Sequence, residues 1–145
     1  MSTAQQIIER LALQPHREGG WFRETWRAEA PAGERAQATA IHFLLEAGQR
    51  SQWHKVDAAE VWLWHAGDPL MLSEAADDQG PVREIVLGSD VLAGEAAQHV
   101  IAPHHWQAAA PLAGPHGYTL VSCVVAPAFE FDGFVLAEPN WQPGA

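Results

Sequence analysis

The chain has 145 residues, enough for one domain with a real hydrophobic core and too few for a second. Its formal net charge of −10, with 8 Lys and Arg against 18 Asp and Glu, excludes nucleic acid and anionic membranes as favourable partners. No apolar run approaches the length of a bilayer crossing, and the N-terminus lacks the apolar core of a secretion signal. We therefore expect one soluble, cytoplasmic domain over residues 1–145.

The N-terminal segment predicts one short amphipathic helix. Thr3 and Gln6 have the spacing of a capping box, and Ile7, Ile8 and Leu11 then share one face. A proline four residues further on ends the pattern.

Beyond the helix, turn residues recur every eight to twelve positions, a rhythm typical of an all-β sandwich or barrel. A closed or doubly layered antiparallel sheet also leaves few exposed edges. We expect a short helical turn near residue 93 and a loosely held tail after Glu138. The predicted strands are 20–28, 39–46, 51–56, 60–66, 70–75, 83–88, 98–102, 106–111, 118–126 and 129–136.

One histidine and one carboxylate stand out in a stretch that also holds three tryptophans: His54 lies six positions before Glu60. If Glu60 points inward, strand alternation turns Trp62 and Trp64 inward too. A hairpin turning at 57–59 brings the histidine and the carboxylate together between apolar indole walls. Such a pair suits general acid–base chemistry, and the alternative is a plain contact between strands.

Two residues of a later strand are candidate ligand contacts. The flat ring of Trp106 suits a base or sugar, as do those of Trp62 and Trp64, and Gln107 is a possible polar reader of the ligand. The alternative is that these rings fill the interior of a small barrel.

Eight histidines raise the possibility of a metal site. His104 and His105 are adjacent and point to opposite faces of a strand, so they cannot chelate together. His16, His99 and His116 lie near turns and are expected in solvent.

The spacing around His54 resembles the first motif of the cupin superfamily. Gly48 is followed after five residues by His54, Glu60 follows, and Gly67 comes six residues later, with Val56 where the motif has a second histidine. In the second motif, "VIAPHHWQAAAP", the proline at 103 fits, but His105 replaces a glycine and Ala108 replaces a histidine. Two of the four metal ligands usual in cupins are therefore missing.

Longer pieces resemble the cupin-5 family, a branch of unknown function. These are "LALQPHREGGWFRETWRA", "TAIHFLLE", "SQWHKVDAAEVWLWHAGDPLML", "VIAPHHWQAA" and "LVSCVVAPAFEFDGF", which lie in order between residues 11 and 134. The resemblance implies a double-stranded β-helix, or jelly-roll barrel, with an internal pocket and a homodimeric assembly. "REGGWFRET" is also similar, more distantly, to the opening strand of metal-independent deoxysugar-nucleotide epimerases, which implies that Arg23 and Glu24 line a ligand site.

Our leading hypothesis is a cupin that binds a small polar ligand such as a sugar or nucleotide-sugar derivative. If it is an enzyme, it is a metal-independent isomerase, epimerase or dehydratase. His54 then acts as the general base, and Glu60 orients the imidazole or serves as the second acid/base. One alternative is a divalent-metal enzyme with His54 and Glu60 as ligands. The other is a binding or sensor barrel without catalysis.

Overall fold

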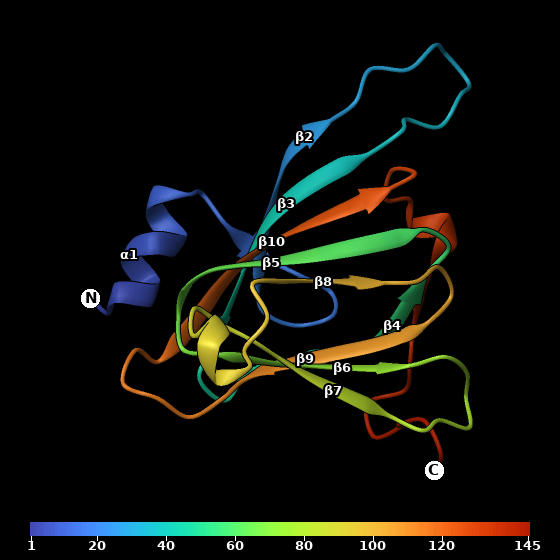
Figure 1. The fold of residues 1–145 in the computed structure, drawn as a ribbon. Helices are drawn as coiled ribbons and strands as arrows, with labels where there is room; N and C mark the ends of the chain where they lie inside the picture. The colour runs from blue at the N-terminus through green and yellow to red at the C-terminus, as the bar shows by residue number, and fades with distance from the viewer.

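The computed structural model describes all residues from 1 to 145 as two antiparallel sheets and one α-helix (Figure 1). One sheet has six strands in the order β1-β2-β3-β10-β5-β8, and the other has five in the order β11-β4-β9-β6-β7. The elements are α1 (Thr3–Arg10), β1 (Gln14–Pro15), β2 (Trp21–Arg27), β3 (Thr39–Glu46), β4 (Ser51–Val56), β5 (Ala59–Gly67), β6 (Leu70–Ala75), β7 (Arg83–Leu87), β8 (Gln98–Ile101), β9 (Trp106–Pro111), β10 (Tyr118–Ala126) and β11 (Phe134–Leu136).

The main core lies between the two sheets, because alternate residues of each strand point inward. Phe43 and Leu45 of β3 meet Leu70 and Leu72 of β6 there, with Trp62 of β5 fully buried among them. The predicted all-β, jelly-roll architecture with one short N-terminal helix is confirmed. No helix in the protein combines the length and the apolar character needed to span a membrane.

The helix covers the outer face of the six-stranded sheet at one end (Figure 1). Ala4 of α1 packs there with Leu44 and Tyr118. The capping box is formed by Ser2 and Gln5, one residue earlier than the predicted pair. Ser2 has the extended backbone that an N-cap needs, and its hydroxyl accepts the N–H of Gln5 at 3.1 Å.

The predicted hairpin between residues 51–56 and 60–66 is wrong. β4 pairs with β9 and β11 in the five-stranded sheet, whereas β5 pairs with β10 and β8 in the other. The connection at 57–58 therefore carries the chain from one sheet to the other. Ala58 is fully buried in that connection, and Asp57 is bound by both terminal nitrogens of Arg35. β4 and β5 consequently face each other across the interior.

The C-terminal region departs from the prediction in two places. Only Phe134–Leu136 of the last predicted strand pairs as a strand, and a 3₁₀ turn at Phe131–Gly133 precedes it. The tail is also better held than expected, since the Trp141 ring packs 4.5 Å from that of Trp106 and the Gly144 N–H donates to Asp78. A 3₁₀ turn at Val91–Ala93 ends where the short helical turn was predicted.

Candidate functional site

A cavity of about 290 Å³ lies against the six-stranded sheet, beside β2, β3, β5 and β10, and the segment at 129–131 forms part of its wall. Its inner end is formed by buried groups: Glu60, Thr39, Val125 and the side chain of His16. Its outer rim carries exposed groups: Glu24, Arg27, Glu130 and Phe131. The cavity thus joins a desolvated acidic end to a charged mouth.

Glu60 is fixed at the inner end by a directed hydrogen-bond chain. The indole N–H of Trp62 donates to Gln107 Oε1 at 2.7 Å, and Gln107 Nε2 donates to Glu60 Oε1 at 2.9 Å. Because an indole can only donate, it sets the orientation of the Gln107 amide. Burial raises the pKa of Glu60 to about 7, against the opposing effects of His54 and Gln107. Glu60 can therefore take up or release a proton near neutral pH.

His54 lies behind Glu60 and is paired with a carboxyl that the sequence analysis did not single out. Its Nδ1 donates to the Gln52 carbonyl at 2.7 Å, and its Nε2 lies 3.2 Å from Glu18 Oε2. Glu18 also accepts the hydroxyl of Ser51 at 2.8 Å. Burial lowers the pKa of His54 and raises the pKa of Glu18. We therefore assign one shared proton to this pair, carried by Glu18 and directed at Nε2.

His16 is part of the site, and its expected exposure to solvent is wrong. A tight turn folds the chain back, with the His16 N–H donating to the Gly20 carbonyl at 3.0 Å. Gly20 has φ +78°, and a Cβ there would lie 2.9 Å from the Leu44 carbonyl oxygen, so the turn requires glycine. His16 Nδ1 accepts the Glu18 N–H at 3.1 Å, which leaves the proton of the neutral ring on Nε2. Burial lowers the pKa of this imidazole.

The predicted site residues divide into groups that the structure places differently. Glu60 and Glu24 line the cavity, and His54 and Gln107 lie behind it, within the same buried cluster as Glu60. Trp62 and Trp64 point inward but pack in the core, one donating to Gln107 and the other to the Asp68 carbonyl at 3.1 Å.

Two predicted residues lie away from the cavity. Arg23 is exposed and does not line the cavity. The residues on either side of it in β2, Phe22 and Glu24, do line the cavity. Trp106 packs with Trp53 on the outer side of the five-stranded sheet and donates to Asp78 at 2.7 Å. The structure brings neither residue together with Glu60.

The groups that complete the site were not predicted from the sequence: His16, Glu18, Arg27, Glu130 and the rings of Phe22, Phe129 and Phe131. One signal was available for part of this set. Phe22 and Glu24 alternate along "GGWFRET", so the inward face of this strand could have been extended back through the two glycines toward Glu18. The phenylalanines carry no comparable signal.

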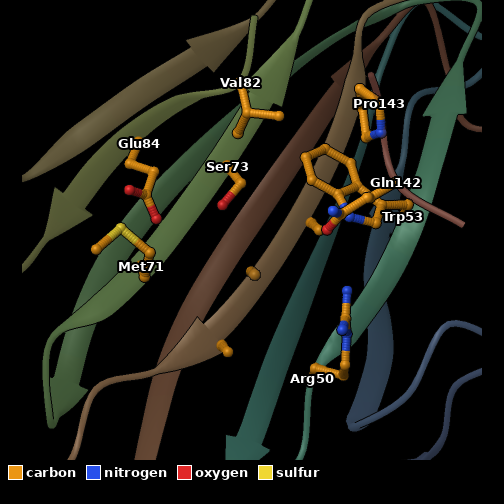
Figure 2. A pocket seen from close by; sticks show the side chains of 11 residues that line it. Arg50, Trp53, Met71, Ser73, Val82, Glu84, Gln142 and Pro143 are labelled. Atoms are coloured by element: carbon orange, nitrogen blue, oxygen red, sulfur yellow. The ribbon is translucent and has the colours of Figure 1, made fainter. Parts of the chain in front are cut away.

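A second hollow, of about 460 Å³, lies on the outer face of the five-stranded sheet. Figure 2 shows Trp53, Gln142 and Pro143 on one side of it, and Met71, Ser73 and Glu84 on the other. Three consecutive alanines, 108 to 110, also line it.

The architecture defines the class of protein. A solved oxalate decarboxylase variant from Bacillus subtilis shares the fold with a TM-score of 0.62 at 15% identity, covering 85% of this chain and 29% of that chain. This likeness shows the cupin jelly-roll fold alone.

Two other solved structures are more similar. A hypothetical protein from Leishmania major is 32% identical, with a TM-score of 0.86, and the match covers 94% of this chain and 88% of that one. A protein from Shewanella oneidensis is 34% identical, also with a TM-score of 0.86, over 95% and 86% of the two chains. The family model of the cupin superfamily described as DUF985 matches residues 5–137, and the chain belongs to this cupin-5 family. No curated protein matches the chain.

The donor set does not fit the metal ion that many cupins hold. Both ring nitrogens of His54 are engaged, one by the Gln52 carbonyl and the other by Glu18. The two remaining motif positions are Val56 and Ala108, which offer no ligand atom. No three His, Cys, Asp or Glu side chains are arranged to hold an ion. The residues at these positions therefore do not make the usual cupin metal site.

Proposed function

We propose that the protein binds a small polar organic molecule in the inner cavity and catalyses a proton transfer on it, as an isomerase, epimerase or dehydratase does. The observation that carries the proposal is the placement of Glu60. Its carboxyl lies at the buried end of the cavity, is oriented by Gln107, and has a pKa raised by burial to about 7. A general acid or base works best when its pKa is near the working pH.

The proposal gives the proton-exchanging role to Glu60 instead of His54. The side chain of His54 is 2% exposed, is not part of the cavity wall, and directs Nε2 at Glu18. His54 still acts on the site indirectly, because its contact with Glu18 holds that second carboxyl in the same buried cluster as Glu60. It is a positioning residue.

The imidazole of His16 lines the same cavity as Glu60 and supplies a second functional group. In the proposed reaction, the Glu60 carboxylate removes a proton from a carbon next to a carbonyl. The His16 Nε2–H donates to the carbonyl oxygen as negative charge develops there. Epimerisation is complete when the bound enolate turns over and Glu60 returns the proton to the opposite face of the same carbon. Isomerisation is complete when Glu60 returns the proton to the former carbonyl carbon and the hydroxyl proton of the carbon first deprotonated passes to the former carbonyl oxygen, so that the C=O bond moves by one carbon.

The volume of the cavity limits the size of the ligand that it can enclose. About 290 Å³ lies at the small end of ligand pockets, which suits a molecule of single-sugar size. A complete nucleotide-sugar is too large to be enclosed there. Of the ligands expected from the sequence, we therefore keep the single-sugar derivative and drop the nucleotide-sugar.

Deuterium exchange tests the proposal. D-glucose, D-fructose and D-glucosamine are incubated with the protein in D₂O, and loss of the C–H signal next to the carbonyl is followed by NMR. We expect exchange with at least one probe, and a loss of about 10²- to 10⁴-fold in Glu60→Gln. Glu84→Gln, in the outer hollow, is the matched control and keeps the wild-type rate.

Two results contradict the proposal. Exchange that persists at the wild-type rate in Glu60→Gln removes Glu60 from the mechanism. Binding of a probe without any exchange assigns the protein to the class of non-catalytic binding barrels.

A further inference from the structure

The rim of the cavity has an excess of negative charge. Arg27 lies between two carboxylates, with Nη2 2.8 Å from Glu24 Oε1 and Nη1 3.7 Å from Glu130 Oε1. Its Nε also contacts Glu24 Oε2 at 3.3 Å, and its Nη2 donates to the Phe129 carbonyl at 3.1 Å. The guanidinium is thus already used by protein oxygens. One positive group against two negative groups leaves the rim at about −1.

The inner end adds no positive charge to offset this. Glu60 is a third carboxyl, and burial lowers the pKa of His16, which keeps its imidazole neutral near pH 7. Among the residues that line the cavity, Arg27 is the one permanent cation, and protein oxygens already bind it; Arg17 lies outside the lining, against the Phe131 ring. A phosphate or carboxylate entering the cavity must give up its water next to like charges, which is costly in a partly closed site.

Aromatic rings complete the lining with negative faces of their own. Phe22, Phe129 and Phe131 line the cavity, and the rings of Phe129 and Phe131 meet edge to face at 4.9 Å. The Arg17 guanidinium already lies 4.0 Å from the centre of the Phe131 ring. Phenyl faces beside carboxylates are a combination that recognises alkylammonium groups.

We propose that the cavity selects a small organic cation, namely a polyhydroxylated primary amine of the amino-sugar class. The ammonium group lies at the rim between the carboxylates and the phenyl rings, and the carbon skeleton extends toward Glu60. The position of the reacting end rests on the proposed function. The charge preference rests on the rim alone.

Three matched probes of equal ring size test the charge preference by calorimetry at pH 7 and low salt: D-glucosamine, D-glucose and D-glucose 6-phosphate. We expect D-glucosamine to bind about tenfold more tightly than D-glucose, and no measurable binding of the phosphate ester. Raising the salt concentration from 50 to 500 mM should weaken D-glucosamine binding several-fold and leave D-glucose binding nearly unchanged.

A charge-removing variant localises the effect. Glu130→Gln should reduce the affinity for D-glucosamine several-fold more than the affinity for D-glucose. Glu84→Gln, in the outer hollow, should change neither affinity. The proposal is overturned if D-glucosamine does not bind, if the probes bind equally, or if the phosphate ester binds best. Because binding is measured without turnover, a protein that prefers the amine but exchanges no proton refutes the proposed reaction and keeps this inference.

Discussion

The two hollows of this barrel differ in a way that size alone does not reveal. The outer one is larger, about 460 Å³ against about 290 Å³ for the inner cavity. Its carboxylate, Glu84, is exposed on β7, and small alanine side chains form part of its surface (Figure 2). The inner cavity ends on a buried carboxyl with fixed partners.

The two hollows therefore differ in how far each carboxyl group is removed from water, and not only in volume. Glu84 is exposed to water on β7. Glu60 is removed from water, and this raises its pKa to about 7. Four changes, from the largest expected effect to the smallest, test whether the two hollows really differ in this way.

Removing the partner of His54 should have the largest effect. Glu18→Ala leaves the His54 Nε2 and the Ser51 hydroxyl without their buried partner, and we expect a loss of about 3 to 5 kcal/mol in the free energy of unfolding. Glu84→Ala in the outer hollow should change it by less than about 0.5 kcal/mol. Urea denaturation measures both. Equal losses in the two variants contradict a buried, partnered Glu18.

The pH dependence of stability should distinguish Glu60 from any surface acid. Its pKa is raised from 4.5 to about 7 in the folded state, so between these values the folded state holds a proton that the unfolded state has released. The contribution of Glu60 to stability is therefore full below pH 4.5 and is lost as the pH rises to about 7. The loss amounts to about 3 kcal/mol at most.

Comparison with a neutral variant isolates this effect. Glu60→Gln should gain stability relative to wild type as the pH rises through this window, and Glu84→Gln should not. A stability difference between Glu60→Gln and wild type that stays flat from pH 4 to pH 8 rules out a buried, protonated Glu60.

Gln107→Leu should shift the pH range in which Glu60 titrates. The substitution removes a hydrogen bond that favours the charged form of Glu60 and leaves the Trp62 N–H unpaired. We expect about 2 kcal/mol of destabilisation and a titration of Glu60 that moves to higher pH. Gln142→Leu, in the outer hollow, is the control. The titration of the Glu60 carboxyl is followed by NMR in both proteins. A titration of Glu60 that moves to lower pH in Gln107→Leu contradicts the assigned hydrogen bond.

Trp106→Phe should have the smallest effect. It removes the hydrogen bond to Asp78 on the outer side of the sheet, at a cost of about 1 kcal/mol. Affinity for a ligand of the inner cavity should stay unchanged. A marked loss of affinity would restore the sequence-based hypothesis that Trp106 holds the ligand.

Much of the fold could be predicted because its signals are local. The alternation in "TAIHFLLE" and the turn residues around it placed the strand at 39–46, with the bounds that β3 has. The pairing of strands could not be derived from these signals. The stretches 51–56 and 60–66 look like a hairpin in sequence, yet the chain changes sheets between them.

The site was predictable only in part for the same reason. His54 and Glu60 were found from spacing and both point into the interior, but their direct partners come from elsewhere. Glu18 lies 36 positions before His54 (54 − 18), and Gln107 lies 47 positions from Glu60. Nothing in the spacing of one motif can select such partners.

By itself, the sequence determined most of the strands, the inward face of β5 and the cupin-5 kinship. Each of these depends on neighbouring residues or on a contiguous motif. Tertiary structure alone decided which groups lie at the cavity, that His54 faces Glu18, and that the buried carboxyl of the cavity is Glu60. The physical reason is that these side chains become buried and paired only when the two sheets pack together. Packing removes the water around them, and the loss of water shifts their pKa values.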